Sequence, residues 1–95
     1  MIQLNVVECA EKLGIEHLLE IMKVLRSPEG CPWDREQTYQ SIRNEVLEEA
    51  YEVCDAIDQN DKVSLCEELG DLLLQVVFHS TMASELGDFS FSDVT

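Results

Sequence analysis

Residues 65–79 read LCEELGDLLLQVVFH, and this stretch carries most of the information about the fold. Its apolar residues recur at helical spacings, and the segment 62–86 runs without a proline until Gly87, a residue typical of a helix end. The positions Leu72–Leu74 and Val76–Phe78 are apolar almost all the way round the expected helix. One neighbouring helix could not cover such a surface, so either further C-terminal sequence or a second subunit must cover it. We expect a homo-oligomer, most simply a dimer with its helices packed into a bundle.

Two further helices are predicted on the N-terminal side of this segment. Residues 15–26 and 39–58 both show apolar positions three and four residues apart, and the turn 59–61 separates the second helix from the third. The prolines and the glycine of 27–32 end the first of these helices, and 33–38 is expected to be an ordered connector. Thr38 or Ser41 is a candidate cap for the second helix, and Ser92 for a helix that begins near the end. The fold class is therefore all-α, in one domain over 1–95 with residues 1–14 as a leader.

The helix patterns also define the expected packing faces. Ile42, Val46, Ala50, Val53 and Ile57 form an apolar stripe on 39–58, and Leu65, Leu69, Leu72 and Val76 form one on 62–86. Acidic residues lie beside both stripes: Glu45, Glu49 and Glu52 flank the first, and Glu68 and Asp71 flank the second. These acids are expected to border the contact between the two helices, although Glu-x-x-Glu spacing also occurs on ordinary acidic surfaces.

The composition limits the kinds of partner. Twenty Asp and Glu residues against six Lys and Arg residues give a formal net charge of −14. Such a chain repels nucleic acid and anionic membranes, so neither is an expected partner. The four cysteines form no CxxC pair, and the sequence lacks a signal-peptide pattern and a span of about 20 apolar residues. We therefore expect a soluble cytoplasmic protein with free thiols.

The acidic clusters predict a metal site. Carboxylates three residues apart lie on one side of a helix, and carboxylates from two facing helices can close on one ion. Burying like charges together is costly without a cation. An oxygen-only set of ligands favours Mg²⁺, with Mn²⁺ as an alternative. A carboxylate-bridged di-iron or di-manganese protein is a rival interpretation, but such sites usually contain Glu-x-x-His, which neither histidine provides.

Three motifs together resemble the MazG-type nucleoside triphosphate pyrophosphohydrolases. They are the CPWDREQT run at 31–38, the LEEAYEV block at 47–53, and EELGDLLLQVVFH at 67–79, so the resemblance covers 15–94. The EExxE…ExxD signature is present in full, with 15 residues between its halves. The resemblance implies a helical core that dimerises and Mg²⁺-dependent hydrolysis of nucleoside triphosphates to the monophosphate and pyrophosphate, in nucleotide pool cleaning or house-keeping. It also implies a further C-terminal helix, so the chain is expected to be truncated.

The resemblance assigns roles to individual residues. Carried over position by position, the metal ligands are Glu49, Glu52, Glu68 and Asp71, and the catalytic carboxylates are Glu48, which supports or orients water, and Glu49. Trp33, Arg35 and His79 are candidate substrate-binding residues. Side chains in such positions are more often a packing anchor (Trp33), a solvated surface charge (Arg35) and a hydrogen-bonded histidine (His79). Gln75, one turn after Asp71, is a candidate for orienting a ligand. A non-catalytic interaction module with the same core remains the alternative function.

Overall fold

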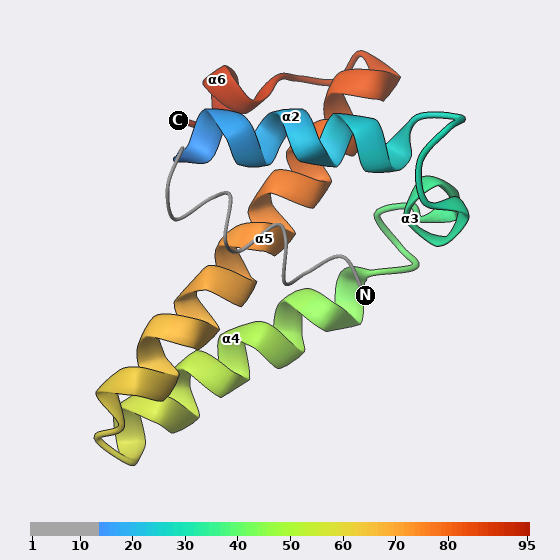
Figure 1. Cartoon of the computed structure of the whole chain (residues 1–95). Helices are drawn as coiled ribbons and strands as arrows, with labels where there is room; N and C mark the ends of the chain where they lie inside the picture. Colours follow the sequence, from blue (N-terminus) through green and yellow to red (C-terminus); the bar gives the residue numbers. More distant parts are fainter. Residues whose placement is uncertain (1–13) are drawn as a thin grey trace. The chain divides into compact units, whose positions relative to one another are not determined.

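The computed structural model describes residues 14–95, and all regular secondary structure in this range is helical (Figure 1). The helices are α2 (Ile15–Arg26), α3 (Pro32–Glu36), α4 (Arg43–Asp58), α5 (Lys62–Leu86) and α6 (Phe91–Val94). The predicted all-α fold class is confirmed. The predicted leader lies outside the described residues apart from Gly14. The chain divides into two compact units, one ending at Gln37 and the other spanning Thr38–Thr95, and the prediction of a single domain stays a prediction.

In the first unit, α2 has the predicted bounds and buries Leu18 and Met22, one turn apart. After α2 the chain reverses tightly, and the Ser27 hydroxyl donates to the Val24 carbonyl at 2.6 Å. Gly30 is required in this turn because a Cβ there would lie 2.1 Å from the Val24 carbonyl oxygen. The turn can therefore form only because glycine has no side chain.

The predicted connector at 33–38 is wrong in part, because it contains the short helix α3. Pro32 occupies the first turn, where a missing N–H costs no helical hydrogen bond. The Arg26 guanidinium at the end of α2 donates to the carbonyl of Asp34 at 2.6 Å and to that of Gln37 at 3.2 Å. These bonds tie the end of α2 to the end of α3, which a periodicity argument cannot detect.

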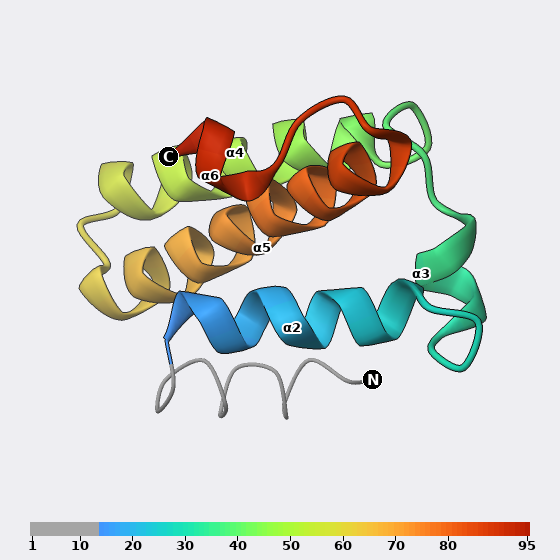
Figure 2. The same cartoon turned by 90° about the horizontal axis from the view of Figure 1, so that it is seen from above.

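In the second unit, α4 and α5 form an antiparallel hairpin joined by residues 59–61, and α6 contacts α5 (Figures 1 and 2). The 25 residues of α5 match the predicted segment 62–86. Asp61 begins the helix by accepting a hydrogen bond from the Ser64 amide at 3.1 Å. Gly87 ends it with φ of 77°, a left-handed conformation that costs residues with a Cβ about 1–2 kcal/mol.

The second helix was predicted to begin at Tyr39, but α4 begins at Arg43. Thr38 and Ser41 bond to each other instead of capping the helix: the Thr38 amide donates to Ser41 Oγ at 2.8 Å, and the Ser41 amide donates to Thr38 Oγ1 at 3.2 Å. Serine and threonine side chains compete with helix formation through such local bonds. The segment before Arg43 is therefore a turn.

The predicted cap at Ser92 is also wrong, since Ser90 caps α6. The Ser90 hydroxyl accepts from the Asp93 amide at 3.4 Å, and the Asp93 carboxylate accepts from the Ser90 amide at 2.9 Å. This reciprocal arrangement is a capping box. Asp93 supplies the acidic residue that the motif needs three positions after the cap.

The packing face of α4 differs from the predicted stripe. Ile42 is 1% exposed, and Val46 and Val53 are half-buried as expected, but Ala50 and Ile57 are exposed. The remaining positions on the covered side are Glu45 and Glu49, both half-buried, and Ala56, buried. Buried and half-buried residues thus lie at 42, 45, 46, 49, 53 and 56, which places Glu49 within the packing face and not at its border.

The same rotation is found on α5. Leu69 and Val76, predicted for the stripe, are 49% and 38% exposed, whereas Glu68, Leu72 and Gln75 are half-buried. Leu65 and Leu72 of the predicted stripe are thus covered as expected, and Glu68 and Gln75, predicted to flank the stripe, share the covered side with them. Within residues 14–95, no helix is both long enough and apolar enough to cross a membrane.

The cap of α5 can be tested by substitution at Asp61. Asp61→Ala removes an acceptor from the Ser64 amide and hydroxyl, and we expect a loss of about 1 kcal/mol in the free energy of unfolding, measured by urea denaturation. Asp61→Asn keeps a capping oxygen and should retain most of the stability. Equal destabilisation by both variants would contradict the role of the hydrogen bond.

Candidate metal centre

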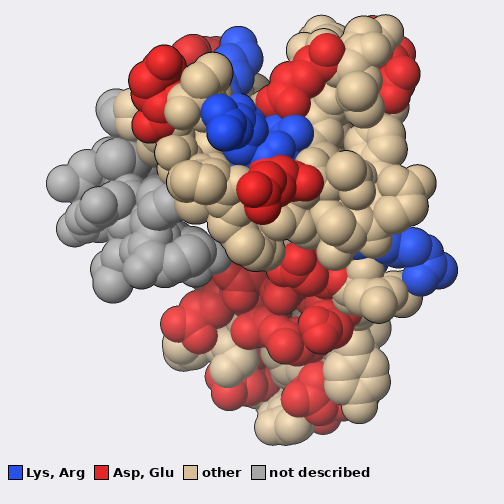
Figure 3. All heavy atoms as spheres, turned by 90° about the vertical axis from the view of Figure 1, so that its right-hand side faces the viewer, with Lys and Arg blue, Asp and Glu red and all other residues tan. Residues whose placement is uncertain are grey.

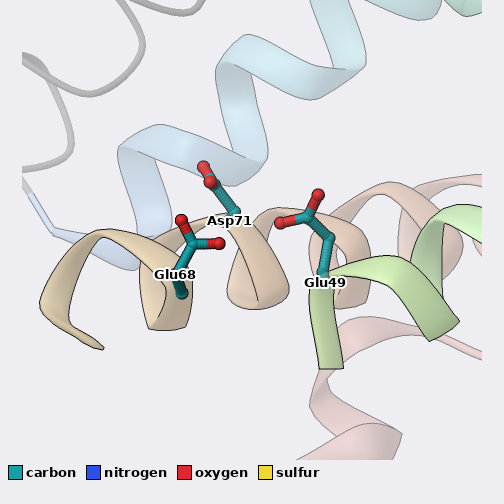
Figure 4. Close-up of side chains that lie close together, drawn as sticks. All are labelled: Glu49, Glu68 and Asp71. Atoms are coloured by element: carbon teal, nitrogen blue, oxygen red, sulfur yellow. The ribbon is translucent and has the colours of Figure 1, made fainter. Parts of the chain in front are cut away.

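Three carboxylates meet between α4 and α5 in the second unit. Glu49 comes from α4, and Glu68 and Asp71 come from α5 (Figure 4). One oxygen of each lies within 4.8 Å of the others, which is close enough for all three to bind one ion. Among residues 14–95 this is the group of metal-binding side chains that comes together in this way.

The hairpin explains why these residues converge. Glu68 and Asp71 are three residues apart on α5, so their side chains leave the helix on the same side. The antiparallel course of the hairpin brings Glu49 of α4 opposite them, since each helix extends away from the same turn at 59–61. Sequence spacing places the pair on α5, while the third carboxylate depends on the register between the helices.

The carboxylate oxygens of this cluster are incompletely satisfied. Within the described chain, buried side-chain oxygens without a hydrogen-bond partner occur on three residues: Glu49 (Oε2), Glu68 (Oε2) and Gln75 (Oε1). Leaving a buried charged oxygen unpaired is expensive, and native proteins rarely do so without an ion or water. The unpaired oxygens of Glu49 and Glu68 fit a bound cation.

The raised pKa values of the cluster carboxylates also favour a bound cation. Burial, followed by repulsion from Asp71 and Glu52, raises the pKa of Glu49 above its ordinary value. A shared carboxyl–carboxyl hydrogen bond with Glu52, together with burial and neighbouring charges, raises the pKa of Glu68 to about 7. Burial and the charges of Glu52 and Glu67 raise the pKa of Asp71. Each carboxylate thus resists ionisation without a counter-charge.

Glu52, the fourth predicted ligand, lies beside this group. It is exposed and reaches the cluster through its contact with Glu68. Both residues also line a polar pocket of about 350 Å³, which continues toward the hairpin turn through Asp55, Gln59, Asp61 and Ser64. Sequence reasoning missed this pocket, although a short turn between two acidic helices is the signal that could have indicated it.

Glu48 is exposed on α4, and its charge contributes to the raised pKa of Glu49. In the space-filling view, acidic side chains gather over the lower half, where the α4–α5 hairpin lies (Figure 3). A negative surface of this kind attracts cations and repels a polyphosphate. The predicted role of Glu48 as a water-orienting carboxylate remains a prediction.

The substrate-binding candidates fall in both units. Trp33 and Arg35 lie on α3 in the first unit, both exposed, and their predicted role remains a prediction. His79 lies on α5, where its Nδ1 bonds to the Gln75 carbonyl at 2.8 Å and its ring stacks on Tyr39 at a centroid distance of 6.1 Å. Since a carbonyl only accepts, Nδ1 carries the proton and Nε2 is the remaining acceptor.

His79 also lines a mainly apolar pocket of about 360 Å³ in the second unit. The other lining residues are Tyr39, Gln40, Arg43, Val46 and Leu47. The Tyr39 hydroxyl donates to the Asp88 carboxylate at 3.0 Å, which holds the aromatic ring in place. This pocket and the carboxylate cluster share no residue, although α4 and α5 contribute to both.

The arrangement defines an all-α protein whose helical hairpin carries an oxygen-only carboxylate cluster. Residues 37–95 match the family described as the MazG nucleotide pyrophosphohydrolase domain, and the chain belongs to this family. The resemblance inferred from the CPWD, EExxE and ExxD motifs is therefore confirmed.

Named relatives support the same assignment. The chain is 53% identical over 79 residues to the nucleoside triphosphate pyrophosphohydrolase/pyrophosphatase MazG of Thermotoga maritima, and 57% identical over 81 residues to a nucleoside triphosphate pyrophosphohydrolase of Escherichia coli. These matches cover 83% and 84% of this chain but 31% of each relative. The chain thus spans less than a third of the length of these curated relatives.

A metal-free preparation should lose stability as the pH rises. The raised pKa of Glu68 means that the folded state holds a proton between pH 4.5 and about 7 that the unfolded state has released. The associated stability is present below pH 4.5 and is lost as the pH rises through 7. We expect the melting temperature in EDTA to fall over this range, as measured by circular dichroism.

Two comparisons isolate the cause of this pH dependence. Glu68→Gln cannot ionise and should flatten the pH profile, whereas Asp58→Asn, on an exposed residue of α4, should leave it unchanged. Added Mg²⁺ or Mn²⁺ should raise the melting temperature most at pH 8, where the carboxylates are ionised. A pH profile of Glu68→Gln identical to that of the unmodified chain would contradict the assignment.

Proposed function

We propose that this chain carries the catalytic site for Mg²⁺-dependent hydrolysis of nucleoside triphosphates to a nucleoside monophosphate and pyrophosphate. The observation that carries the proposal is the convergence of Glu49, Glu68 and Asp71 within 4.8 Å, with unpaired buried oxygens on the two glutamates. The names of the relatives support the reaction class, because they are nucleoside triphosphate pyrophosphohydrolases.

The cation would be held by the three clustered carboxylates, with Glu52 as the fourth ligand. When bound, Mg²⁺ supplies positive charge that neutralises the triphosphate and increases the acidity of water. The residues themselves hold the ion between two helices joined by a short turn, a rigid support for a precise site. Carboxylate oxygens are hard ligands, so the same site would also bind Mn²⁺.

The chemical step consumes one water molecule. Its oxygen bonds to the α-phosphorus, the bond from that phosphorus to the bridging oxygen of the β-phosphate breaks, and pyrophosphate leaves. The proton lost by the water passes to a carboxylate, for which Glu48 and Glu49 are the candidates. Glu48 suits proton transfer because it is exposed and stands next to a cluster residue.

The nucleotide needs contacts beyond the metal. We assign Arg35 to a phosphate, Trp33 to the nucleobase by stacking, and His79 to a polar group of the substrate through Nε2. His79 suits this role because its ring is held in one tautomer and one orientation by Gln75 and Tyr39. We also place the enzyme in the cytoplasm, the location expected from its sequence.

We further propose that the chain assembles as a homodimer. Leu69, Leu73 and Val76 form a row on α5 and are 49%, 44% and 38% exposed, and Leu47 of α4 is 57% exposed. Rows of exposed leucine and valine on a folded domain mark a surface that another chain covers. A second copy offers the same row, as an isologous contact requires.

The activity is tested by pyrophosphate release from a panel of unmodified and modified nucleoside triphosphates, with and without Mg²⁺. We expect release that depends on Mg²⁺ and that falls by at least about 100-fold in Glu49→Gln, the size of effect expected when a metal ligand or a base is lost. Circular dichroism of the variant should show the same helical content.

Asp58→Asn is the matched control, because it removes one negative charge from an exposed position of α4. Its rate should equal that of the unmodified chain. Absence of release with every substrate, together with identical behaviour of Glu49→Gln, would favour a non-catalytic interaction module. Tightly held iron with an oxo-type absorption band would instead favour the di-metal interpretation.

The dimer is tested with Leu73→Glu, which places a charge in the centre of the exposed row on α5. We expect light scattering after gel filtration to show a dimer for the unmodified chain and a monomer for the variant at the same concentration. Leu86→Glu, at the exposed end of α5, is the control and should remain dimeric. A monomeric unmodified chain would contradict the assembly.

A further inference from the structure

Gln75 lies one turn after Asp71 on α5. Positions 68, 71 and 75 are spaced by three and four residues, so their side chains leave the helix on one side. The residue is half-buried, and its Oε1 atom is buried without a hydrogen-bond partner. The other two unpaired buried side-chain oxygens in residues 14–95 belong to Glu49 and Glu68, both members of the carboxylate cluster.

A buried carbonyl without a donor costs about 1–3 kcal/mol, so its retention calls for a physical reason. Once ionised, as they would be around a cation, the carboxylates of the cluster accept hydrogen bonds and donate none, so they cannot then satisfy Gln75 Oε1. The missing partner must therefore be a donor or a cation that enters the site from outside. The cation that would satisfy Glu49 and Glu68 brings water molecules with it, and water is such a donor.

The position of Gln75 is well supported by the fold. Its backbone carbonyl accepts from His79 Nδ1 at 2.8 Å, and the His79 ring stacks on Tyr39, which is bonded to Asp88. The residue also lies in the middle of the 25-residue helix α5, far from either frayed end. A side chain on such an element can orient a neighbouring group with little loss of conformational entropy.

The amide also suits this position by its charge. The cluster already contains three carboxylates whose pKa values are raised: by burial and neighbouring acidic residues for Glu49 and Asp71, and by a hydrogen bond with Glu52, burial and neighbouring charges for Glu68. Another acidic residue would add to the repulsion in the metal-free protein, whereas an amide adds an oxygen without adding charge. Magnesium keeps several water molecules when it binds to proteins, so a neutral acceptor beside the ion can accept hydrogen bonds from these waters.

We infer that Gln75 is a positioning residue of the cation site, whose Oε1 accepts a hydrogen bond from water in the hydration shell of the ion held by Glu49, Glu68 and Asp71. The inference rests on the cation site of the proposed function but not on turnover. It assigns to Gln75 a contribution to metal affinity that the four carboxylates of the motif do not include.

The test measures Mn²⁺ binding to the full chain by isothermal titration calorimetry and by electron paramagnetic resonance, without nucleotide. In Gln75→Met, which has a similar shape but no carbonyl, we expect Mn²⁺ affinity to fall by about 10-fold or more. The melting temperature in EDTA should stay the same or rise, because an unpaired buried oxygen has been removed. If Gln75 had only a structural role, the variant would bind Mn²⁺ with unchanged affinity and its melting temperature in EDTA would fall.

Gln75→Glu provides a second measurement with the opposite sign. A carboxylate at this position should strengthen Mn²⁺ binding and lower the melting temperature in EDTA through added repulsion. Gln40→Met, an exposed glutamine of the same unit that lines the Tyr39–His79 pocket, is the control and should bind Mn²⁺ like the unmodified chain.

Unchanged Mn²⁺ affinity in Gln75→Met would overturn the inference. Weaker binding by Gln75→Glu would also overturn it, since the amide nitrogen rather than the oxygen would then face the ion. The outcomes separate the two proposals: a chain without hydrolysis whose Gln75→Met variant binds Mn²⁺ weakly refutes only the proposed function. An active chain whose Gln75→Met variant binds Mn²⁺ normally refutes only the inference.

Discussion

The structure depends on how like charges are accommodated between two packed helices. Glu49 of α4 and Glu68 of α5 occupy positions at which the spacing of covered residues would ordinarily place apolar side chains. Burial and neighbouring carboxylates raise the pKa of Glu49, and a hydrogen bond with Glu52, together with burial and neighbouring charges, raises the pKa of Glu68. The clustered carboxylates therefore lower the stability of the cation-free α4–α5 hairpin, and the same cluster favours the binding of a cation. In a chain with a net charge of −14, such an ion also makes contact with a polyphosphate possible.

The remainder of the second unit keeps this site in register. Asp61 begins α5 with a side-chain cap, and Gly87 ends it in a left-handed conformation, so the helix between them presents Glu68, Asp71 and Gln75 on one side. A single inserted residue would rotate everything beyond it by about 100° and would separate these groups. Capping and turn chemistry at the ends of α5, away from the carboxylates, thus determine whether the carboxylates can share an ion.

Much of the helical fold could be predicted from the sequence, and each wrong prediction has a physical cause. The helices over 15–26 and 62–86 were predicted with their observed bounds, because periodicity agreed with the prolines and glycine of 27–32 after the first helix and with Gly87 after the second. The start of α4 was placed four residues early, since Thr38 and Ser41 form reciprocal hydrogen bonds that compete with the helix. The apolar stripes were misjudged because Ala50 and Ile57 are exposed. Periodicity identifies a helical face but not how far neighbouring helices rotate it.

The sequence by itself determined the helical class, the family, and the pairing of Glu68 with Asp71, because these depend on local periodicity and on motifs within one segment. Only the tertiary structure decided that Glu49 joins them within 4.8 Å, that Glu52 reaches the cluster through Glu68, and that Gln75 Oε1 lacks a partner. The physical reason is that helical spacing governs contacts within a helix, whereas the register and rotation of α4 against α5 arise from packing among residues far apart in the chain.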